Sequence, residues 1–280
     1  HNFAEGDAKV SVTASIAEGS VETPGITGWV KNADNNSTHV NFTQDGDYTM
    51  AVEYTDLAGN AADVVVVDEF TVDTTPPVLE IGGVEDHSAN QGEAAPTITY
   101  HDINYAADKT EVAISGYKNR NGKNLTGIAN ESQFGGKFIC DNIAEIPEND
   151  DVYLCVGHVE DLAGNSSEAE VTFSVNRFGS NYILDDSARN LVEQYYTNKA
   201  PTIQVTEINV NSLEFQEITA TMNGDILDLV KGQDYQVTEA GGEGSWKEYH
   251  YTIPAEFFDK DSVYNITIHS RDEAQNENSN

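Results

Sequence analysis

The sequence predicts an all-β protein made of three antiparallel β-sandwiches in tandem. Three observations lead to this prediction: a frame of residues occurs three times, apolar and polar residues alternate over short segments, and Gly, Asn, Asp and Pro separate these segments. The 280 residues give three repeats of roughly 100 residues, which is a common domain size. We expect the repeats to span residues 1–73, 74–176 and 177–280.

The repeated frame joins a tyrosine, an aspartate and an asparagine at fixed spacing. In each copy an Asp follows the Tyr by eight residues, an Asn follows this Asp by four, and another Asp precedes the Tyr by three. The frame tyrosines are Tyr48, Tyr153 and Tyr264. We expect each Tyr to begin a strand, and the Asp-to-Asn run to turn the chain into the next strand with Gly59 and Gly164 at positive φ. Gln275 replaces this Gly in the third copy, which predicts a different or looser turn there.

The first and third copies differ from the second at their outer ends. The segment Pro96–Tyr105 aligns with Pro201–Val210, but in the first copy only its last three residues have a counterpart, His1–Phe3. Long alternating segments follow the first two frames, whereas only Glu277–Asn280 follows the third. We therefore expect repeat one to lack its first strand and repeat three its last strand, which would leave an unpaired sheet edge.

Two segments join the repeats. Thr74-Thr-Pro-Pro77 predicts a short, stiff joint, because proline fixes φ and favours an extended predecessor. The second segment, Arg177–Lys199, is longer and contains apolar residues at helical spacing after Asp185. These residues are Ala188, Leu191, Val192 and Tyr195. We expect one short capped helix there, packed at the junction.

The frame resembles a known family of repeats. A Tyr at the start of a strand, preceded by Asp, is similar to the tyrosine corner of immunoglobulin-like sandwiches. The run Asp45–Asn60, followed by Asp68–Pro77, resembles the tandem bacterial immunoglobulin-like repeats of large Gram-positive surface proteins. This resemblance covers all three repeats and implies a secreted or cell-wall-attached protein in which such repeats form a stalk or adhesive surface. It implies no catalytic residues.

Charge and motifs exclude several classes of function. The chain has 14 Lys and Arg against 48 Asp and Glu, a net charge of −34, so nucleic acid and anionic membranes would repel it. No apolar run approaches the roughly 20 residues that cross a bilayer, and no histidine lies in a catalytic motif. We expect a non-enzymatic monomer whose partners are the neighbouring repeats of a parent protein. The alternative is a set of accessory modules of a surface enzyme.

Calcium is the sharpest candidate ligand. Asp56, Asn60 and Asp73 of repeat one, with Asp102 of repeat two, are candidate oxygen ligands near the first joint, since Ca²⁺ selects hard oxygen ligands on turns. The other interpretation is that Asp56 and Asn60 hydrogen-bond the backbone of their own turn. No Asp-x-Asp-x-Asp-Gly loop arranges six or more ligands, so the sequence predicts no obligatory cofactor and leaves Ca²⁺ open.

The two cysteines leave two alternatives. Cys155 occupies the inward position that Met50 and Ile266 occupy in the other copies, so the fold does not require a bridge there. Cys140 falls on the preceding strand, which makes a Cys140–Cys155 disulfide geometrically reasonable. The pair is either bridged or free and buried.

Large aromatic residues precede each frame tyrosine. Trp29, Phe134 and Trp246 lie 19, 19 and 18 residues before it, and this recurrence favours a core position over a sugar-stacking face. The run Trp246, Tyr249, His250 and Tyr251 is nevertheless the candidate strip for binding a glycan or a host surface protein.

Overall fold

The computed structural model describes residues 8–15, 26–31, 36–40, 42, 44–54, 59–61, 63, 65–117, 125, 127–141, 143–241 and 246–280. Contacts group the chain into two compact units. The first comprises residues 1–78, 102–109 and 160–167, and the second comprises residues 79–101, 110–159 and 168–280. One end of repeat two therefore belongs to the first unit, and the boundaries of the three repeats at residues 73 and 176 stay predictions.

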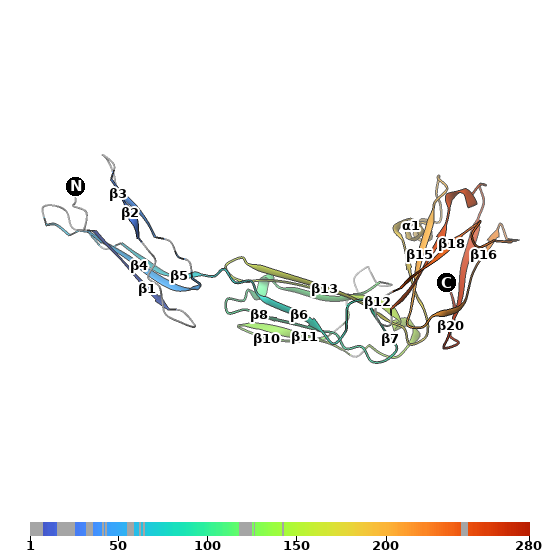
Figure 1. Ribbon diagram of the computed structural model, residues 1–280, viewed down its shortest axis with the longest axis horizontal. Helices are drawn as coiled ribbons and strands as arrows, with labels where there is room; N and C mark the ends of the chain where they lie inside the picture. Colours follow the sequence, from blue (N-terminus) through green and yellow to red (C-terminus); the bar gives the residue numbers. More distant parts are fainter. Residues whose placement is uncertain are drawn as a thin grey trace. The chain divides into compact units, whose positions relative to one another are not determined.

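Repeat one contains a three-stranded sheet and a separate hairpin (Figure 1). The sheet has the order β1-β4-β5, the hairpin pairs β2 with β3, and all pairs are antiparallel. The strands are β1 (Ala8–Ser15), β2 (Ile26–Lys31), β3 (Asn36–Val40), β4 (Gly46–Tyr54) and β5 (Val65–Val72). The segment His1–Phe3, on which the expected loss of a first strand rests, lies outside the described residues.

Repeat two is a sandwich of two four-stranded sheets, ordered β10-β11-β8-β6 and β7-β13-β12-β9. The sheets face each other, because a Cβ added at Gly157 on β12 would lie 3.0 Å from the Leu79 side chain on β6. The strands are β6 (Val78–Gly82), β7 (Ser88–Asn90), β8 (Thr97–His101), β9 (Glu111–Gly116), β10 (Gly127–Ser132), β11 (Gly135–Cys140), β12 (Asp151–Glu160) and β13 (Ser166–Val175). The pairing of β7 with β13 is parallel.

Repeat three has the same plan, with sheets ordered β14-β15-β19-β18 and β17-β16-β20-β21. The strands are β14 (Asn181–Leu184), β15 (Ile203–Asn209), β16 (Leu213–Met222), β17 (Asp225–Leu227), β18 (Gln236–Gly241), β19 (Lys247–Ile253), β20 (Tyr264–Asp272) and β21 (Glu277–Ser279). Repeat three was expected to lack its last strand. This expectation is wrong for Glu277–Ser279, which form β21 and pair with β20. This strand has three residues, whereas β13 of repeat two has ten.

The frame tyrosines form the predicted corners. Each tyrosine hydroxyl donates a hydrogen bond to the backbone carbonyl four residues upstream. The acceptors are the carbonyls of Gln44, Asn149 and Lys260, at 2.8, 2.7 and 3.3 Å. A tyrosine corner together with the strand order of the sandwiches identifies tandem immunoglobulin-like domains, which confirms the predicted fold class.

The turn after the third frame is not looser than the turn after the second. Gln275 adopts φ +67°, close to the +93° of Gly164, and both turns close with a hydrogen bond from the Asp N–H to the Asn carbonyl at 3.1 and 3.0 Å. The prediction of a different turn is therefore wrong. The N–H and side-chain amide of Asn276 donate hydrogen bonds to the Asp272 carboxylate, and this turn holds Gln275 in the left-handed region that normally favours glycine.

The linker helix is confirmed. Helix α1 (Asp186–Gln194) is capped by Asp185, whose carboxylate accepts a hydrogen bond from the Ala188 N–H at 2.7 Å. Arg189 on this helix lies 4.8 Å above the Tyr117 ring of repeat two, so the helix packs at the junction as expected. The sequence did not predict β14, which begins repeat three inside the expected linker. Among the described residues, no helix is both long and apolar enough to span a membrane.

The core of repeat three encloses a carboxylate. Glu207 is fully buried, and its carboxylate accepts hydrogen bonds from the hydroxyls of Tyr251 at 2.5 Å, Tyr182 at 3.3 Å and Ser270. Burial, with the Glu207 charge as the second cause, raises the pKa of both tyrosines well above the ordinary value. This group therefore replaces apolar packing at the centre of the sandwich by a hydrogen-bonded network.

Both cysteines are free and buried in the structure, so the interpretation without a bridge holds there. Burial raises the pKa of the Cys140 thiol from 9.0 to about 11 and that of Cys155 to about 12. The thiols of the unfolded chain therefore lose their protons at lower pH than those of the folded chain.

This difference predicts alkaline destabilisation. Above pH 9.0 the unfolded state binds fewer protons than the folded state, so the free energy of unfolding should fall as pH rises. Urea unfolding between about pH 8 and 10 would measure the slope. The Cys140→Ala/Cys155→Ala variant should show a flatter slope over this range, and an unchanged slope would contradict the assignment to the thiols.

Candidate cation site at Asp73, Asp102 and Asp161

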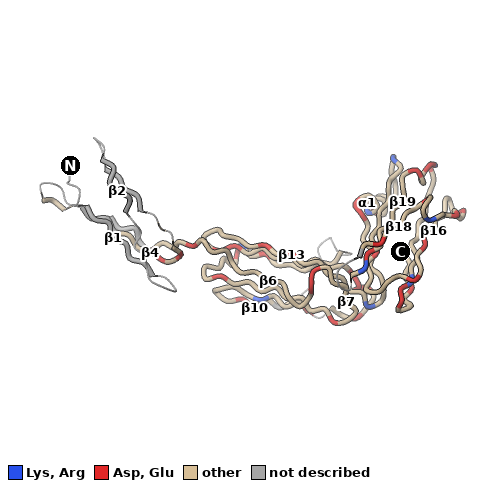
Figure 2. Tube along the Cα trace, in the orientation of Figure 1, with Lys and Arg blue, Asp and Glu red and all other residues tan. Residues whose placement is uncertain are grey.

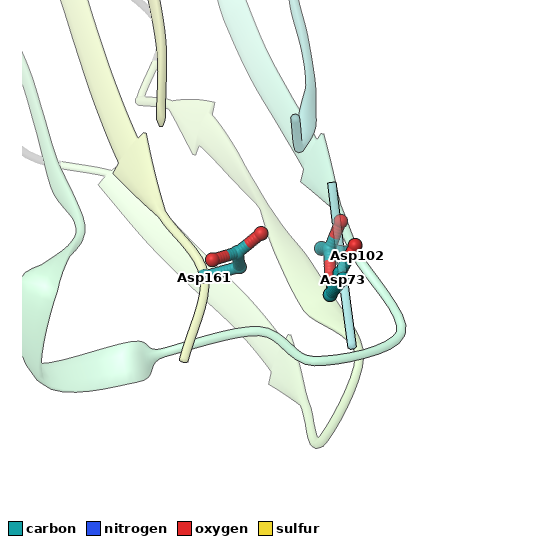
Figure 3. Close-up of side chains that lie close together, drawn as sticks. All are labelled: Asp73, Asp102 and Asp161. Atoms are coloured by element: carbon teal, nitrogen blue, oxygen red, sulfur yellow. The ribbon is translucent and has the colours of Figure 1, made fainter. Parts of the chain in front are cut away.

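Three carboxylates converge at one end of repeat two. Asp73 follows β5, Asp102 follows β8 and Asp161 follows β12, and an oxygen of each lies within 4.8 Å of those of the others. Figure 3 shows the side chain of Asp161 directed toward those of Asp73 and Asp102. All three belong to the first compact unit. Asp102 and Asp161 are 6% and 0% exposed, so two of these charges are removed from water.

Asparagine side chains and the backbone fix the three carboxylates. Asp161 accepts hydrogen bonds from the Asn165 N–H at 2.9 Å and from its side-chain amide at 2.7 Å. Asp73 accepts one from the Asn104 amide at 2.6 Å, and the Asn104 N–H donates to Asp102 at 2.6 Å. The amide of Asn165 also donates to the Asp73 carbonyl at 3.1 Å. The repeated Asp-to-Asn run thus ties the turn after β12 to the segment that follows β5.

The same segment is held from repeat one by Asp45, the residue three before the first frame tyrosine. Its carboxylate accepts hydrogen bonds from the hydroxyl of Thr75 at 2.6 Å and from the N–H and hydroxyl of Thr74 at 2.9 and 2.8 Å. The Thr75 bond is the largest cause that lowers the pKa of Asp45. In repeat two the equivalent Asp150 accepts from the Phe178 N–H at 2.6 Å. The frame Asp therefore anchors the segment that leaves its own repeat.

The donor set fits a hard divalent cation. Two unit charges 4 Å apart repel by about 4 kcal/mol at an effective dielectric constant near 20, so a cation between three carboxylates this close would relieve their repulsion. Carboxylate oxygens are the ligands that Ca²⁺ takes, and an oxygen that accepts one hydrogen bond keeps a second lone pair. Lys109 forms its ion pair with Glu160, and the charge of Asp161 acts on it only as a smaller, longer-range influence.

Repeat three contains the same arrangement with different chemistry. Asn176 follows β13 as Asp73 follows β5, and Asn209 accepts from a backbone N–H two residues ahead at 2.9 Å, as Asp102 does. Asp272 accepts from Asn276, as Asp161 accepts from Asn165. The amide of Asn209 donates to Asp272 at 3.3 Å, and that of Asn176 donates to the Ile208 carbonyl at 2.9 Å. Amide donors here occupy the place that a cation would take in the first cluster.

Two of the four residues predicted as calcium ligands come together, one does not, and one lies outside the described residues. Asp73 and Asp102 belong to the cluster. Asp56 lies outside the described residues, and Asn60 is exposed. In the β4–β5 pair Gly46 opposes Val72 and Val52 opposes Val65, so Asn60, between the two strands, lies beyond the opposite end of this hairpin from Asp73. Strand residues rise about 3.3 Å each, which separates Asn60 from the cluster by roughly 20 Å and makes the prediction wrong for this residue.

The residue that the sequence reasoning missed is Asp161. It is the second copy of Asp56, so the frame had already marked it. Asp161 could have been predicted from the position of its turn. The turn between the last two strands lies at the end of the sandwich where the chain enters the repeat. The copy that meets Asp73 is therefore the one in the following repeat.

The predicted binding strip is also wrong. Trp246, Tyr249 and Tyr251 are 3%, 2% and 1% exposed and cannot meet a ligand. Trp246 packs with Ala89 and Val152 of repeat two and with Ile208 of repeat three, while Tyr249 and Tyr251 belong to the core of repeat three. The recurrence of large aromatic residues has no common structural role either, because Phe134 is 42% exposed and the Trp29 side chain lies outside the described residues.

Comparison with known proteins adds little to this geometry. No family model and no curated protein matches the sequence. Among solved structures, a titin I-band fragment is similar with a TM-score of 0.32 and 11% identity over 98% of this chain and 86% of its own. A tetra-tandem repeat from the extending region of a large adhesion protein is similar with a TM-score of 0.35 and 14% identity over 100% of this chain and 66% of its own. The fold assignment rests on the strand order and the tyrosine corners.

Proposed function

We propose that this chain is a non-enzymatic spacer segment of a secreted or cell-wall-attached bacterial surface protein, in a stalk or adhesion region. The observation that carries this proposal is the path of the chain through repeat two. The Ser167 hydroxyl at the start of β13 donates to the Pro77 carbonyl, so the chain enters beside the first residues of β13 and leaves after its last residue, Val175. Tension applied at these two points acts along the ten-residue strand.

The strand pairing near Val175, where the chain leaves repeat two, is of a kind that resists tension. Strand β7 runs parallel to β13, with Ser88 opposite Phe173 and Asn90 opposite Val175. Tension along parallel paired strands must shear their hydrogen bonds together rather than break them one by one. The acidic surface supports the same role, since Figure 2 shows Asp and Glu spread over repeats two and three with few Lys and Arg between them, and like-charged neighbours repel.

Force spectroscopy on the full chain tests the spacer role. Pulled by its two ends, the chain should unfold in discrete steps. Asn90→Ala, which removes the side-chain hydrogen bond to the Ser174 carbonyl at 3.1 Å, should lower the force of one of them. Lys137→Ala, on the exposed face of β11, is the control and should leave all steps unchanged. Smooth extension at low force without steps would contradict a load-bearing role.

The carboxylate cluster favours a further element of this function, a calcium-dependent joint. We propose that Ca²⁺ binds Asp73, Asp102 and Asp161 and thereby ties the Asp73–Pro77 segment to the ends of β8 and β12. The support is the charge difference between the two clusters, since by their contacts, although not by the sequence alignment that pairs Asp102 with Glu207, Asn176 and Asn209 stand where two of the three carboxylates stand in the first cluster. A bound divalent cation would neutralise the two buried carboxylates.

Calcium should raise the melting temperature of the chain, because a ligand that binds only the folded state stabilises it. At a free concentration 100-fold above the dissociation constant, the gain is about 2.7 kcal/mol. Scanning calorimetry in millimolar Ca²⁺ and in chelator would measure it.

Variants of the two clusters provide matched controls. Asp73→Asn/Asp102→Asn gives the first cluster the composition of the second, and it should fold and lose the calcium shift. Asp272→Asn, in the second cluster, should keep the shift. Equal melting temperatures with Ca²⁺ and chelator would rule the site out. A calcium shift retained in the double variant would show that Ca²⁺ binds at other residues.

A further inference from the structure

Helix α1 and the segment that follows it form a small groove on repeat three. The helix packs beside β15 (Figure 1), and a groove of about 210 Å³ lies between the helix and residues 196–201. Four helix residues line it from one face of α1, since they are three or four positions apart. These are Ser187, Asn190, Leu191 and Gln194, and Tyr196 and Pro201 line the opposite side.

Two adjacent tyrosines at the C-terminal end of this helix face the solvent. Tyr195 and Tyr196 are 82% and 88% exposed, and neither side chain forms a hydrogen bond or ring contact with another described residue. Tyr195 adopts φ +60°, in the left-handed region where Gly or Asn commonly ends a helix and a bulky residue is rare. This exposed side chain offsets the backbone strain with little packing. Because strained residues cluster at ligand sites, the tyrosine pair indicates binding rather than stability.

The polar side chains of the groove are free to bind a ligand. Asn190 and Gln194 are exposed and lie four residues apart on the same face of α1. Neither amide, nor the Ser187 hydroxyl, hydrogen-bonds another residue in the described part of the chain. Leu191 and Pro201, both half-buried, supply the apolar part of the groove. The groove thus combines free amides with apolar surface and an exposed aromatic ring.

Local hydrogen bonds hold the groove in place without a ligand. The Tyr195 N–H donates to the Leu191 carbonyl at 2.8 Å and closes the helix. The Thr197 hydroxyl donates to the Lys199 carbonyl at 2.9 Å and accepts from the Lys199 N–H at 3.2 Å, which fixes the turn after Tyr196. A preformed site of this kind binds with less loss of conformational entropy than one that must first become ordered.

We propose that this groove binds a neutral saccharide, as a site separate from the spacer role of the chain. A sugar ring has an apolar C–H face and hydroxyls that both donate and accept hydrogen bonds. The Tyr196 ring suits the C–H face, and the amides of Asn190 and Gln194, each a donor and an acceptor, suit adjacent hydroxyls. Tyr195 adds exposed aromatic surface beside them. The net charge of −34 repels an acidic saccharide.

The size of the groove favours a small ligand over a protein. Nine residues line it, whereas a stable protein interface takes about 20–30 residues on each side. Pockets for drug-sized ligands have volumes of about 300–1,000 Å³, so a groove of about 210 Å³ holds part of an oligosaccharide rather than the whole. The proposed ligand is therefore an oligosaccharide that places one ring in the groove.

Glycan binding by the full chain tests the proposal. The probes are immobilised neutral oligosaccharides of glucose, galactose, mannose and N-acetylglucosamine, with sialylated oligosaccharides as the acidic arm. At least one neutral probe should bind, and it should bind more tightly than the sialylated probes. In a titration with the soluble form of that neutral probe, NMR should show saturable shifts of the side-chain amide signals of Asn190 and Gln194.

Variants of the exposed aromatic residues locate the site. Tyr196→Ala should weaken binding at least about tenfold because the ring is lost, whereas Tyr196→Phe should retain most of the affinity. Phe134→Ala, which removes an exposed aromatic side chain from repeat two, is the matched control and should bind like the unsubstituted chain. Melting curves should confirm that all three variants fold. The proposal would be overturned by a chain that binds none of the neutral probes, by tighter binding of the sialylated probes, or by unchanged binding in Tyr196→Ala.

Discussion

Trp246→Ala should lower the free energy of unfolding by about 3–5 kcal/mol, the range observed when a buried large aromatic side chain is truncated. Trp246 is 3% exposed and packs with Ala89 and Val152 of repeat two and Ile208 of repeat three, and its indole N–H donates to Glu248 at 2.5 Å. The substitution leaves a cavity in contact with both repeats. Denaturant unfolding followed by circular dichroism would measure the loss.

An exposed aromatic residue is the matched control for this prediction. Tyr196 is 88% exposed, and Tyr196→Ala should change stability by less than about 0.5 kcal/mol. Similar losses for the two variants would contradict the placement of Trp246 in the core. Because Trp246 lies between repeats two and three, its loss should also separate their unfolding into two transitions if the junction couples them.

Glu207→Leu should destabilise the chain by about 1–3 kcal/mol, the cost of leaving buried hydrogen-bonding groups without their partner. The substitution takes away the carboxylate that the Tyr182, Tyr251 and Ser270 hydroxyls share and leaves only the contacts of Tyr182 with Ser270 at 3.0 Å and of Tyr251 with Gln216 at 3.4 Å. Glu217→Leu makes the same chemical change at an exposed position on β16 and should be nearly neutral. Thermal unfolding at neutral pH would give both values.

A double-mutant cycle tests whether the hydroxyls account for this cost. Adding Tyr251→Phe to Glu207→Leu removes a hydroxyl that has lost its closer acceptor and keeps only Gln216 at 3.4 Å, so the double variant should recover part of the stability. The single Tyr251→Phe variant should lose stability, because it removes a donor from the buried carboxylate. Additive losses of the two substitutions would show that the residues do not act as one network.

Local spacing was sufficient to predict the parts of this protein that depend on neighbours in the sequence. The corner hydrogen bond spans four residues, and so do the bonds between the Asp and the Asn of the second and third frames. The cap of helix α1 spans three. Tyr153, Asp161 and Asp185 could therefore be given roles from sequence alone, because the atoms that they contact lie within one turn of chain.

Partners distant in the sequence could not be predicted in this way. The frame marked Asp56 and Asp161 equally, yet only the position of the turn after β12 in space brings Asp161 to Asp73. The same holds for Trp246, whose sequence neighbours suggested an exposed strip, while its actual neighbour Val152 lies in another repeat. Burial at a junction depends on two surfaces, and each surface is assembled from several strands.

The sequence by itself determined the three tandem sandwiches, their tyrosine corners and the capped linker helix. These features depend on alternating side chains and on hydrogen bonds between residues that are close together in the sequence. Only the tertiary structure decided that Asp73, Asp102 and Asp161 form one cluster and that Trp246 is buried. Each of these depends on which strand ends and sheet edges meet in space, and that is fixed by strand order and packing rather than by spacing along the chain.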